Sequence, residues 1–166
     1  MSRLVISPHH LQAIGRHAAA SYPEECCGVL IGRSGDDGDT SDTSDDGAIV
    51  VERILAVGNE REDSRHNRYV ISPATILAAQ KEARASGLEI VGYYHSHPDH
   101  PAEPSVFDRE HAWPGLSYLI VAVEQGKVAA ARSWRLADDR ERFDEEAVES
   151  APGHPTPPPP QKEAFR

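Results

Sequence analysis

The sequence predicts an α/β domain in which helices pack on a mixed β-sheet. Two segments open with a Ser-Pro pair and carry apolar residues at helical spacing. The other apolar runs are short and rich in β-branched residues, as strands are. The resulting order is helix, two strands, short strand, helix, strand, short helix and two strands, which is typical of α/β proteins. A length of 166 residues and an apolar fraction of 39% suit one domain with a packed core.

The two long helices are predicted from the same start signal. Ser followed by Pro is a favourable N-cap and first helical residue, and it occurs at Ser7-Pro8 and Ser72-Pro73. The first helix is expected to end near Ser21, and the second at Ser86. Each has an apolar face, formed by Leu11, Ile14 and Ala18 in the first helix and by Ile76, Leu77, Ala79 and Ala83 in the second.

The strands are predicted from the remaining apolar runs. Gln125-Gly126 reads as the hairpin turn between the last two strands, and Ser105 reads as the N-cap of a short helix. The predicted strands span residues 24–32, 48–57, 68–71, 88–94, 117–124 and 127–136.

Composition divides the chain into one domain and two appended segments. Residues 1–137 hold all the predicted elements and include a flexible acidic loop at 34–47. The aspartates of this loop lack the spacing of an EF-hand, so calcium is not expected there. Residues 138–150 form a charged extension in which a last short element can dock. Residues 151–166 are rich in proline, which predicts an extended, disordered tail.

Charge and cysteine usage exclude several partners. The net charge of -10 disfavours nucleic acid and anionic membranes, which bind basic patches. The N-terminus lacks the apolar core of a signal peptide, and no apolar run is long enough to span a bilayer. Cys26 and Cys27 are adjacent, and a bridge between neighbours is strained. They are therefore expected to be reduced thiols in a cytoplasmic protein.

The candidate chemistry lies just after the strand at 88–94. Residues two apart in a strand point to one side, so His95 and His97 aim their imidazoles at one point. Prolines then turn the chain, and the segment that starts at Ser105 brings Asp108 back. Two imidazoles and a carboxylate are a three-ligand set for a divalent metal, zinc first. Three protein ligands leave a position for a water, which ionises near neutral pH on the metal.

This stretch resembles the JAMM motif, also called MPN-plus, of metal-dependent proteases and isopeptidases. The motif reads Glu, a long gap, His-Ser/Thr-His, seven residues, Ser, two residues and Asp. Here His95-Ser96-His97 is followed by seven residues, Ser105, two residues and Asp108, with no departure. The resemblance covers residues 5–137 and looks closest to the small single-domain prokaryotic members. It implies the MPN fold, a cytidine-deaminase-like architecture, and one Zn²⁺ per chain on His95, His97 and Asp108.

The resemblance also implies two catalytic residues. The family's glutamate stands seven residues before a glycine, an offset that Glu25 has to Gly32, with Glu24 as the alternative. It would act as the general base. Ser105 would donate a hydrogen bond to the oxyanion, whereas the residues alone favour a capping role, and the two roles conflict only in part.

The activity that the resemblance implies is hydrolysis of an amide bond after the C-terminal Gly-Gly of a ubiquitin-like or sulfur-carrier protein. The tail of such a substrate is expected to lie extended along a sheet edge. The alternative is a non-catalytic MPN scaffold, against which the complete ligand set counts. A metal-binding regulator would keep the ligands without using Glu25. Trp113 is expected either to wall a substrate groove or to fill the core, and the Arg68-Tyr69 pair is given no catalytic role.

Overall fold

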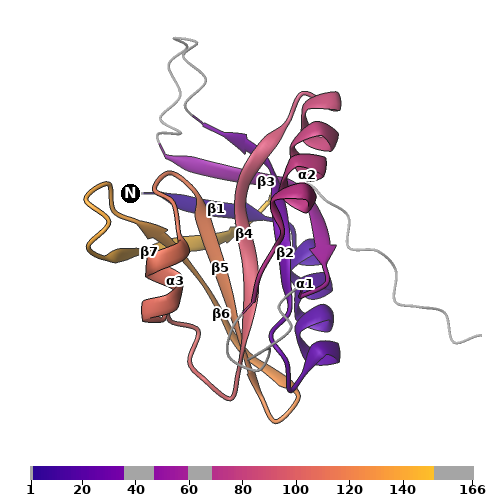
Figure 1. Cartoon of the computed structure of the whole chain (residues 1–166), viewed down its shortest axis with the longest axis vertical. Helices are drawn as coiled ribbons and strands as arrows, with labels where there is room; N and C mark the ends of the chain where they lie inside the picture. Colours follow the sequence, from indigo (N-terminus) through magenta and orange to yellow (C-terminus); the bar gives the residue numbers. More distant parts are fainter. Residues whose placement is uncertain (1, 36–46, 60–68, 152–166) are drawn as a thin grey trace, which may run out of the picture.

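The computed structural model describes residues 2–35, 47–59 and 69–151. Seven strands of this part close into a barrel in the order β1-β3-β2-β4-β5-β6-β7 (Figure 1). The strands are β1 (Arg3–Ile6), β2 (Cys27–Ser34), β3 (Ala48–Val57), β4 (Glu89–Pro98), β5 (Ser117–Glu124), β6 (Lys127–Leu136) and β7 (Phe143–Ser150). The helices are α1 (Pro8–Ser21), α2 (Pro73–Ala85) and α3 (Val106–His111). The acidic loop at 36–46 and the tail from 152 lie outside the described residues.

The sheet is mixed, as predicted. β1 runs parallel to β3 and β7, β4 runs parallel to β5, and the other neighbours are antiparallel. β4, which carries the two histidines, is held between β2 and β5. The ends of this strand therefore have little freedom to move, which suits a site that needs fixed ligand positions.

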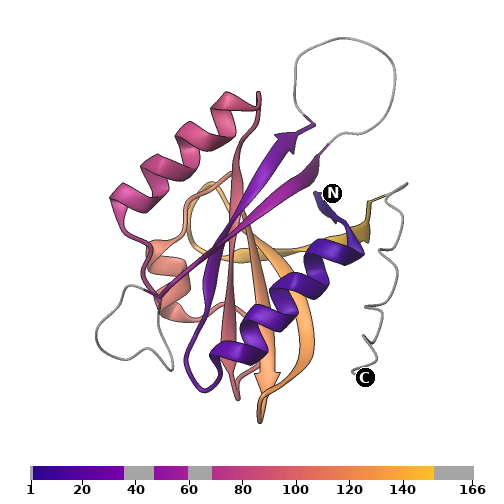
Figure 2. The same ribbon diagram turned by 90° about the vertical axis from the view of Figure 1, so that its right-hand side faces the viewer.

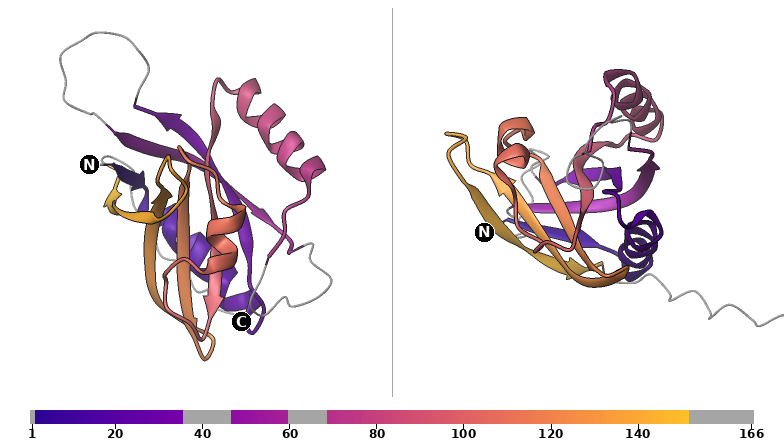
Figure 3. Two further views of the ribbon diagram at one scale, coloured as in Figure 1. Left: turned by 60° about the vertical axis from the view of Figure 1, so that its left-hand side comes forward. Right: turned by 60° about the horizontal axis from the view of Figure 1, so that its bottom comes forward.

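Helices cover both faces of the central strands. Ile14 and Ala18 of α1 pack with Leu30 and Tyr94, whereas Ala79 and Ala83 of α2 pack on the opposite face. Figure 2 shows α1 and α2 on the two sides of β2, β3 and β4. Figure 3 shows α3 in front of the strands and α1 behind them. Because β2 is buried on both faces, its residues form a continuous apolar run rather than an alternating one.

The charged extension at 138–150 was expected to dock a last short element, but it contains an eight-residue strand, β7, that closes the barrel. β7 pairs with β6 on one side and with β1 on the other. Half of its residues are charged, and its one buried residue is Glu146, whose Oε1 accepts a hydrogen bond from the Ser133 hydroxyl at 2.6 Å. A strand with a glutamate inside and few apolar residues does not show the usual alternation, so the pattern could not reveal it.

The prediction of a short strand at 68–71 is wrong for residues 69–71, the part of it that the structure describes. Residues 69–71 belong to no strand, and the backbone N–H of Val70 donates to the Asn59 side chain instead of to a neighbouring strand. Element ends also shift: β2 begins at Cys27, because a turn in which the Glu24 N–H donates to Ser21 O precedes it. Among the described residues, no helix has the length and apolar character needed to cross a membrane.

The close approach of β4 and β5 depends on Gly92. A Cβ added there would collide with the backbone oxygen of Ser117, whereas a Cβ on Gly58 would meet nothing within 4 Å. Gly92→Ala is therefore expected to lower the free energy of unfolding by about 3 kcal/mol. Gly58→Ala is the matched control and should change it by less than about 0.5 kcal/mol. Urea denaturation measures both, and equal midpoints for the two variants would contradict the prediction.

Candidate metal centre and adjoining grooves

Three predicted ligands converge in the structure. His95 and His97 lie near the end of β4, and Asp108 lies in the first turn of α3. The Nε2 atoms of the histidines are 3.2 Å apart, and they lie 3.2 and 3.3 Å from the two carboxylate oxygens of Asp108. All three side chains are buried, and their ligand atoms lie within 4.8 Å of one another. The group thus has the residue types and the closeness that a small divalent cation requires.

The strand and its neighbours fix the direction of the histidines. Tyr94 packs beneath α1, so Tyr93, His95 and His97 point to the other face, where α2 and α3 lie. Ser96 points away from the histidines, and its Oγ accepts a hydrogen bond from the Cys26 N–H at 2.8 Å. This contact ties the end of β4 to the start of β2.

The hydrogen bond of His97 fixes its tautomer. Its Nδ1 lies 2.8 Å from the backbone oxygen of Pro101, which can only accept, so the proton is on Nδ1. A neutral His97 then directs the Nε2 lone pair at a carboxylate oxygen of Asp108, 3.3 Å away. Two acceptors at this separation need a proton or a cation between them. The donor set therefore fits a metal ion.

Charge in the group favours an ionised carboxylate. Burial raises the pKa of Asp108, but His95, the hydrogen bonds from both imidazoles and the Ser105 N–H together lower this pKa well below its usual range. Burial lowers the pKa of His95. For His97 the burial effect is outweighed by its bonds to Asp108 and Pro101, so its pKa is raised. The pKa values of Asp108 and His95 thus favour the ionised carboxylate and the neutral imidazole that bind zinc, whereas a bound ion would have to displace a proton from His97.

Glu25 and Glu24 lie in different surroundings. The side chain of Glu25 is buried, at 4% exposure, while Glu24 is exposed. Glu25 lines a hollow of about 460 Å³ together with His97 and Ser105. Burial raises the pKa of its carboxyl to about 8, with opposing smaller effects from His97 and Asp108. Its Oε2 has no hydrogen-bond partner among the described residues, so this oxygen is available to a bound molecule.

Ser105 caps α3, as the residue pattern predicted. Its Oγ accepts a hydrogen bond from the Asp108 N–H at 3.1 Å, and Asp108 Oδ2 accepts one from the Ser105 N–H at 2.7 Å. These two bonds form a capping box, which places the ligand carboxylate through the backbone of the helix start. The capping bond uses a lone pair of the hydroxyl, so its O–H can still donate to another group.

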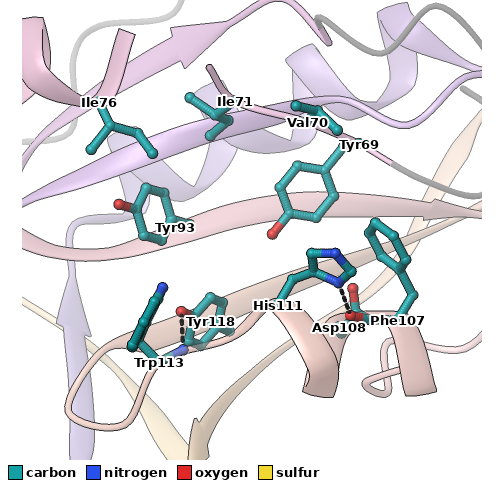
Figure 4. A pocket seen from close by; sticks show the side chains of 10 residues that line it. All are labelled: Tyr69, Val70, Ile71, Ile76, Tyr93, Phe107, Asp108, His111, Trp113 and Tyr118. Carbon is teal, nitrogen blue, oxygen red and sulfur yellow. Dashed lines mark hydrogen bonds between the residues drawn. The ribbon is translucent and has the colours of Figure 1, made fainter. Parts of the chain in front are cut away.

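An aromatic pocket adjoins the other side of Asp108. Its volume is about 240 Å³, and Figure 4 shows the side chains around it. It is lined by Tyr69, Val70, Ile71, Ile76, Tyr93, Phe107, Asp108, His111, Trp113 and Tyr118. Trp113 is 65% exposed, and its backbone N–H donates to the Tyr118 hydroxyl at 2.8 Å. Trp113 is thus a wall of this pocket, and the alternative that it fills the core is wrong.

Two residues at the centre were not recognised from sequence. The ring of Tyr69 stacks on His95 with centroids 4.5 Å apart and planes 23° apart. The Asn59 side chain donates to Glu25 O and accepts from the Val70 N–H, each at 3.2 Å. Both lie in segments without regular structure, where no periodicity indicates which side chain faces the site.

Comparison with known proteins places the chain in a family. Residues 7–137 match the family described as prokaryotic homologs of the JAB domain, Prok-JAB. The chain is 32% identical to the desampylase of Haloferax volcanii over 145 residues, covering 84% of this chain and 94% of the relative. It is 32% identical to the desampylase of Pyrococcus furiosus over 142 residues, covering 82% and 84%. A probable TtuB-protein conjugate cleaving protease of Thermus thermophilus is 34% identical over 74 residues, covering 45% and 49%.

Solved structures agree with this placement. A protein from Desulfitobacterium hafniense is 31% identical, with a TM-score of 0.71 over 91% of this chain and 93% of its own. A JAB1/MPN domain protein from Archaeoglobus fulgidus, 17% identical, has a TM-score of 0.52 over 89% and 96%, which shows the shared fold. From its sequence match and its fold together, this chain belongs to the prokaryotic JAB-domain family, the small JAMM/MPN proteins that its motif resembles.

Proposed function

We propose that the chain is a zinc-dependent isopeptidase that hydrolyses an amide bond after the C-terminal Gly-Gly of a ubiquitin-like or sulfur-carrier protein. The observation that carries this proposal is the convergence of His95, His97 and Asp108 beside a hollow lined by Glu25 and Ser105. Relatives named desampylase and TtuB-protein conjugate cleaving protease support the substrate class.

The residues of the chain divide the reaction between them. His95, His97 and Asp108 would hold the Zn²⁺, which when bound supplies a Lewis acid that activates water and polarises a carbonyl. In its ionised form Glu25, whose Oε2 is buried and without a partner among the described residues, accepts the proton of the attacking water and returns it to the leaving amine. The Ser105 O–H donates to the substrate oxygen as that oxygen gains negative charge.

Crowding around the ligands favours a glycine tail. His95 is fully buried and Asp108 is 9% exposed, and the rings of Tyr69 and Phe107 stand beside them. A backbone without side chains approaches such a site more closely than any other chain segment. Among the described residues, the pairing of β4 with β5 begins at Gly92. Tyr93, the next residue of β4, lines the aromatic pocket, which supports an extended substrate that lies along this strand.

The reduced thiols support a cytoplasmic location for this activity. Cys26 and Cys27 are buried and form no disulfide. Burial raises the pKa of the Cys26 thiol to about 11, so it is an inert core group rather than a nucleophile.

The metal and the activity are tested together. Protein purified without added metal is expected to contain about one zinc per chain, since three buried protein ligands hold the ion and leave the fourth position to water. It should cleave a ubiquitin-like protein extended beyond Gly-Gly, and a chelator should stop the cleavage. His97→Ala is expected to lose both the metal and the activity. A chain that binds no zinc even after zinc is added would instead support the non-catalytic scaffold.

The base is tested by comparing two adjacent glutamates. Glu25→Gln should lower the turnover number at least about 1000-fold, because the amide cannot take the proton, while the zinc content stays the same. Glu24→Gln is the matched control and should leave the turnover number unchanged, since Glu24 is exposed. Full activity in Glu25→Gln would remove Glu25 from the mechanism, and zinc bound without any cleavage in the wild type would favour a metal-binding regulator.

The donor role of Ser105 can be separated from its capping role. Glycine is nearly as good an N-cap as serine, so Ser105→Gly should lower the free energy of unfolding by only about 0.5 kcal/mol. The lost hydroxyl should lower the turnover number about 100-fold with little change in KM, because the bond forms in the transition state. Unchanged turnover in a folded Ser105→Gly variant would leave Ser105 with its capping role alone.

A further inference from the structure

The two histidines of the candidate metal centre are supported differently. His97 is oriented by the bond from its Nδ1–H to Pro101 O, the kind of outer contact that orients most ligand histidines. His95 has no such contact: its Nδ1 is buried and without a hydrogen-bond partner among the residues described. The stacked ring of Tyr69 lies against the same imidazole, with centroids 4.5 Å apart. Among the described contacts, this stack on the face of the imidazole limits the rotation of His95 that an outer hydrogen bond would otherwise limit.

The position of Tyr69 is not fixed by regular secondary structure, because residues 69–71 belong to no helix or strand. The Asn59 side chain holds this segment, since Asn59 Oδ1 accepts a hydrogen bond from the Val70 N–H. The other end of the same amide donates to the backbone oxygen of Glu25. Asn59 lies two residues beyond β3, and the register in which Cys27 pairs with Val57 places it opposite Glu25. One amide thus joins the backbone of the proposed base to the segment that carries the stacked ring.

We propose that Tyr69 and Asn59 are positioning residues of the metal centre: Tyr69 orients the His95 imidazole by stacking, and Asn59 holds both Tyr69 and the Glu25 backbone in place. The inference rests on the proposed metal site. Asn59 thereby has two effects. Its Oδ1 holds the segment whose Tyr69 ring orients the ligand His95, and its Nδ2 holds the backbone of the proposed base Glu25.

Zinc affinity tests the stack without reference to cleavage. Competition with a chromophoric chelator should show about a tenfold weaker zinc complex in Tyr69→Leu than in the wild type, as is typical for loss of an outer contact to a ligand. Tyr69→Phe keeps the ring and should restore the affinity to within about twofold of the wild type. Tyr93→Leu is the matched control: it removes a ring from the same pocket that does not stack on His95, and the affinity should not change.

Substitutions of Asn59 separate its two ends. Asn59→Ala should weaken zinc binding, but adding it to Tyr69→Leu should weaken binding no further, because both act through one ring. Asn59→Asp keeps an acceptor for the Val70 N–H and loses the donor to Glu25 O. Its zinc affinity should be no weaker than in the wild type, while its turnover number falls.

An NMR measurement on the metal-free protein makes this inference independent of the proposed function. The His95 ring protons, assigned with His95→Gln, should show the upfield shift of a stacked ring in the wild type and in Tyr69→Phe. Tyr69→Leu should abolish this shift, and Asn59→Ala should reduce it. Equal zinc affinity in Tyr69→Leu and Tyr69→Phe, or an unchanged His95 signal in Tyr69→Leu, would overturn the inference. A wild type that binds no zinc would overturn the proposed function, while the NMR result would still decide whether the ring positions His95.

Discussion

The approach of three buried acceptor atoms to one point is the constraint on which the rest of the structure depends. The two imidazole Nε2 atoms and the Asp108 carboxylate lie 3.2 to 3.3 Å apart, and His97 presents a lone pair to that carboxylate. Such a group is unfavourable without a proton or a cation, since burial removes the water that would otherwise solvate it. The surrounding elements therefore keep the three side chains at the separations that a bound proton or cation requires.

The strand arrangement around β4 meets this requirement. β4 is paired on both sides, and its side chains alternate between the core beneath α1 and the centre beside α3. Gly92 lets β5 approach β4 closely, and the Ser96 hydroxyl, near the end of β4, accepts a hydrogen bond from the Cys26 N–H. The same strand thus carries core residues on one face and ligands on the other, so the ligand positions depend on the packing of the whole domain.

The spacing of residues along the sequence predicted the parts of the molecule with a regular helix or strand period. It did not predict the parts whose positions depend on single contacts. Period-two geometry indicated that His95 and His97 face one way, and the cap signal at Ser105 indicated where α3 begins. The sequence did not predict that β7 closes the barrel, because the buried residue of β7 is not apolar. It is Glu146, whose carboxylate accepts a hydrogen bond from Ser133. Tyr69 and Asn59 lie in irregular segments, and only the folded chain brings them to His95 and Glu25.

The capping box shows why structural and chemical roles coincide in this centre. α3 has only six residues, too few to form without help from its ends. The bonds between Ser105 and Asp108 supply that help, and they also set the direction of the ligand carboxylate and of the serine hydroxyl. The serine accepts through its oxygen and keeps its proton for a substrate. A residue that merely capped the helix would therefore suffice for the fold, whereas a cap that can also donate is what the proposed chemistry requires.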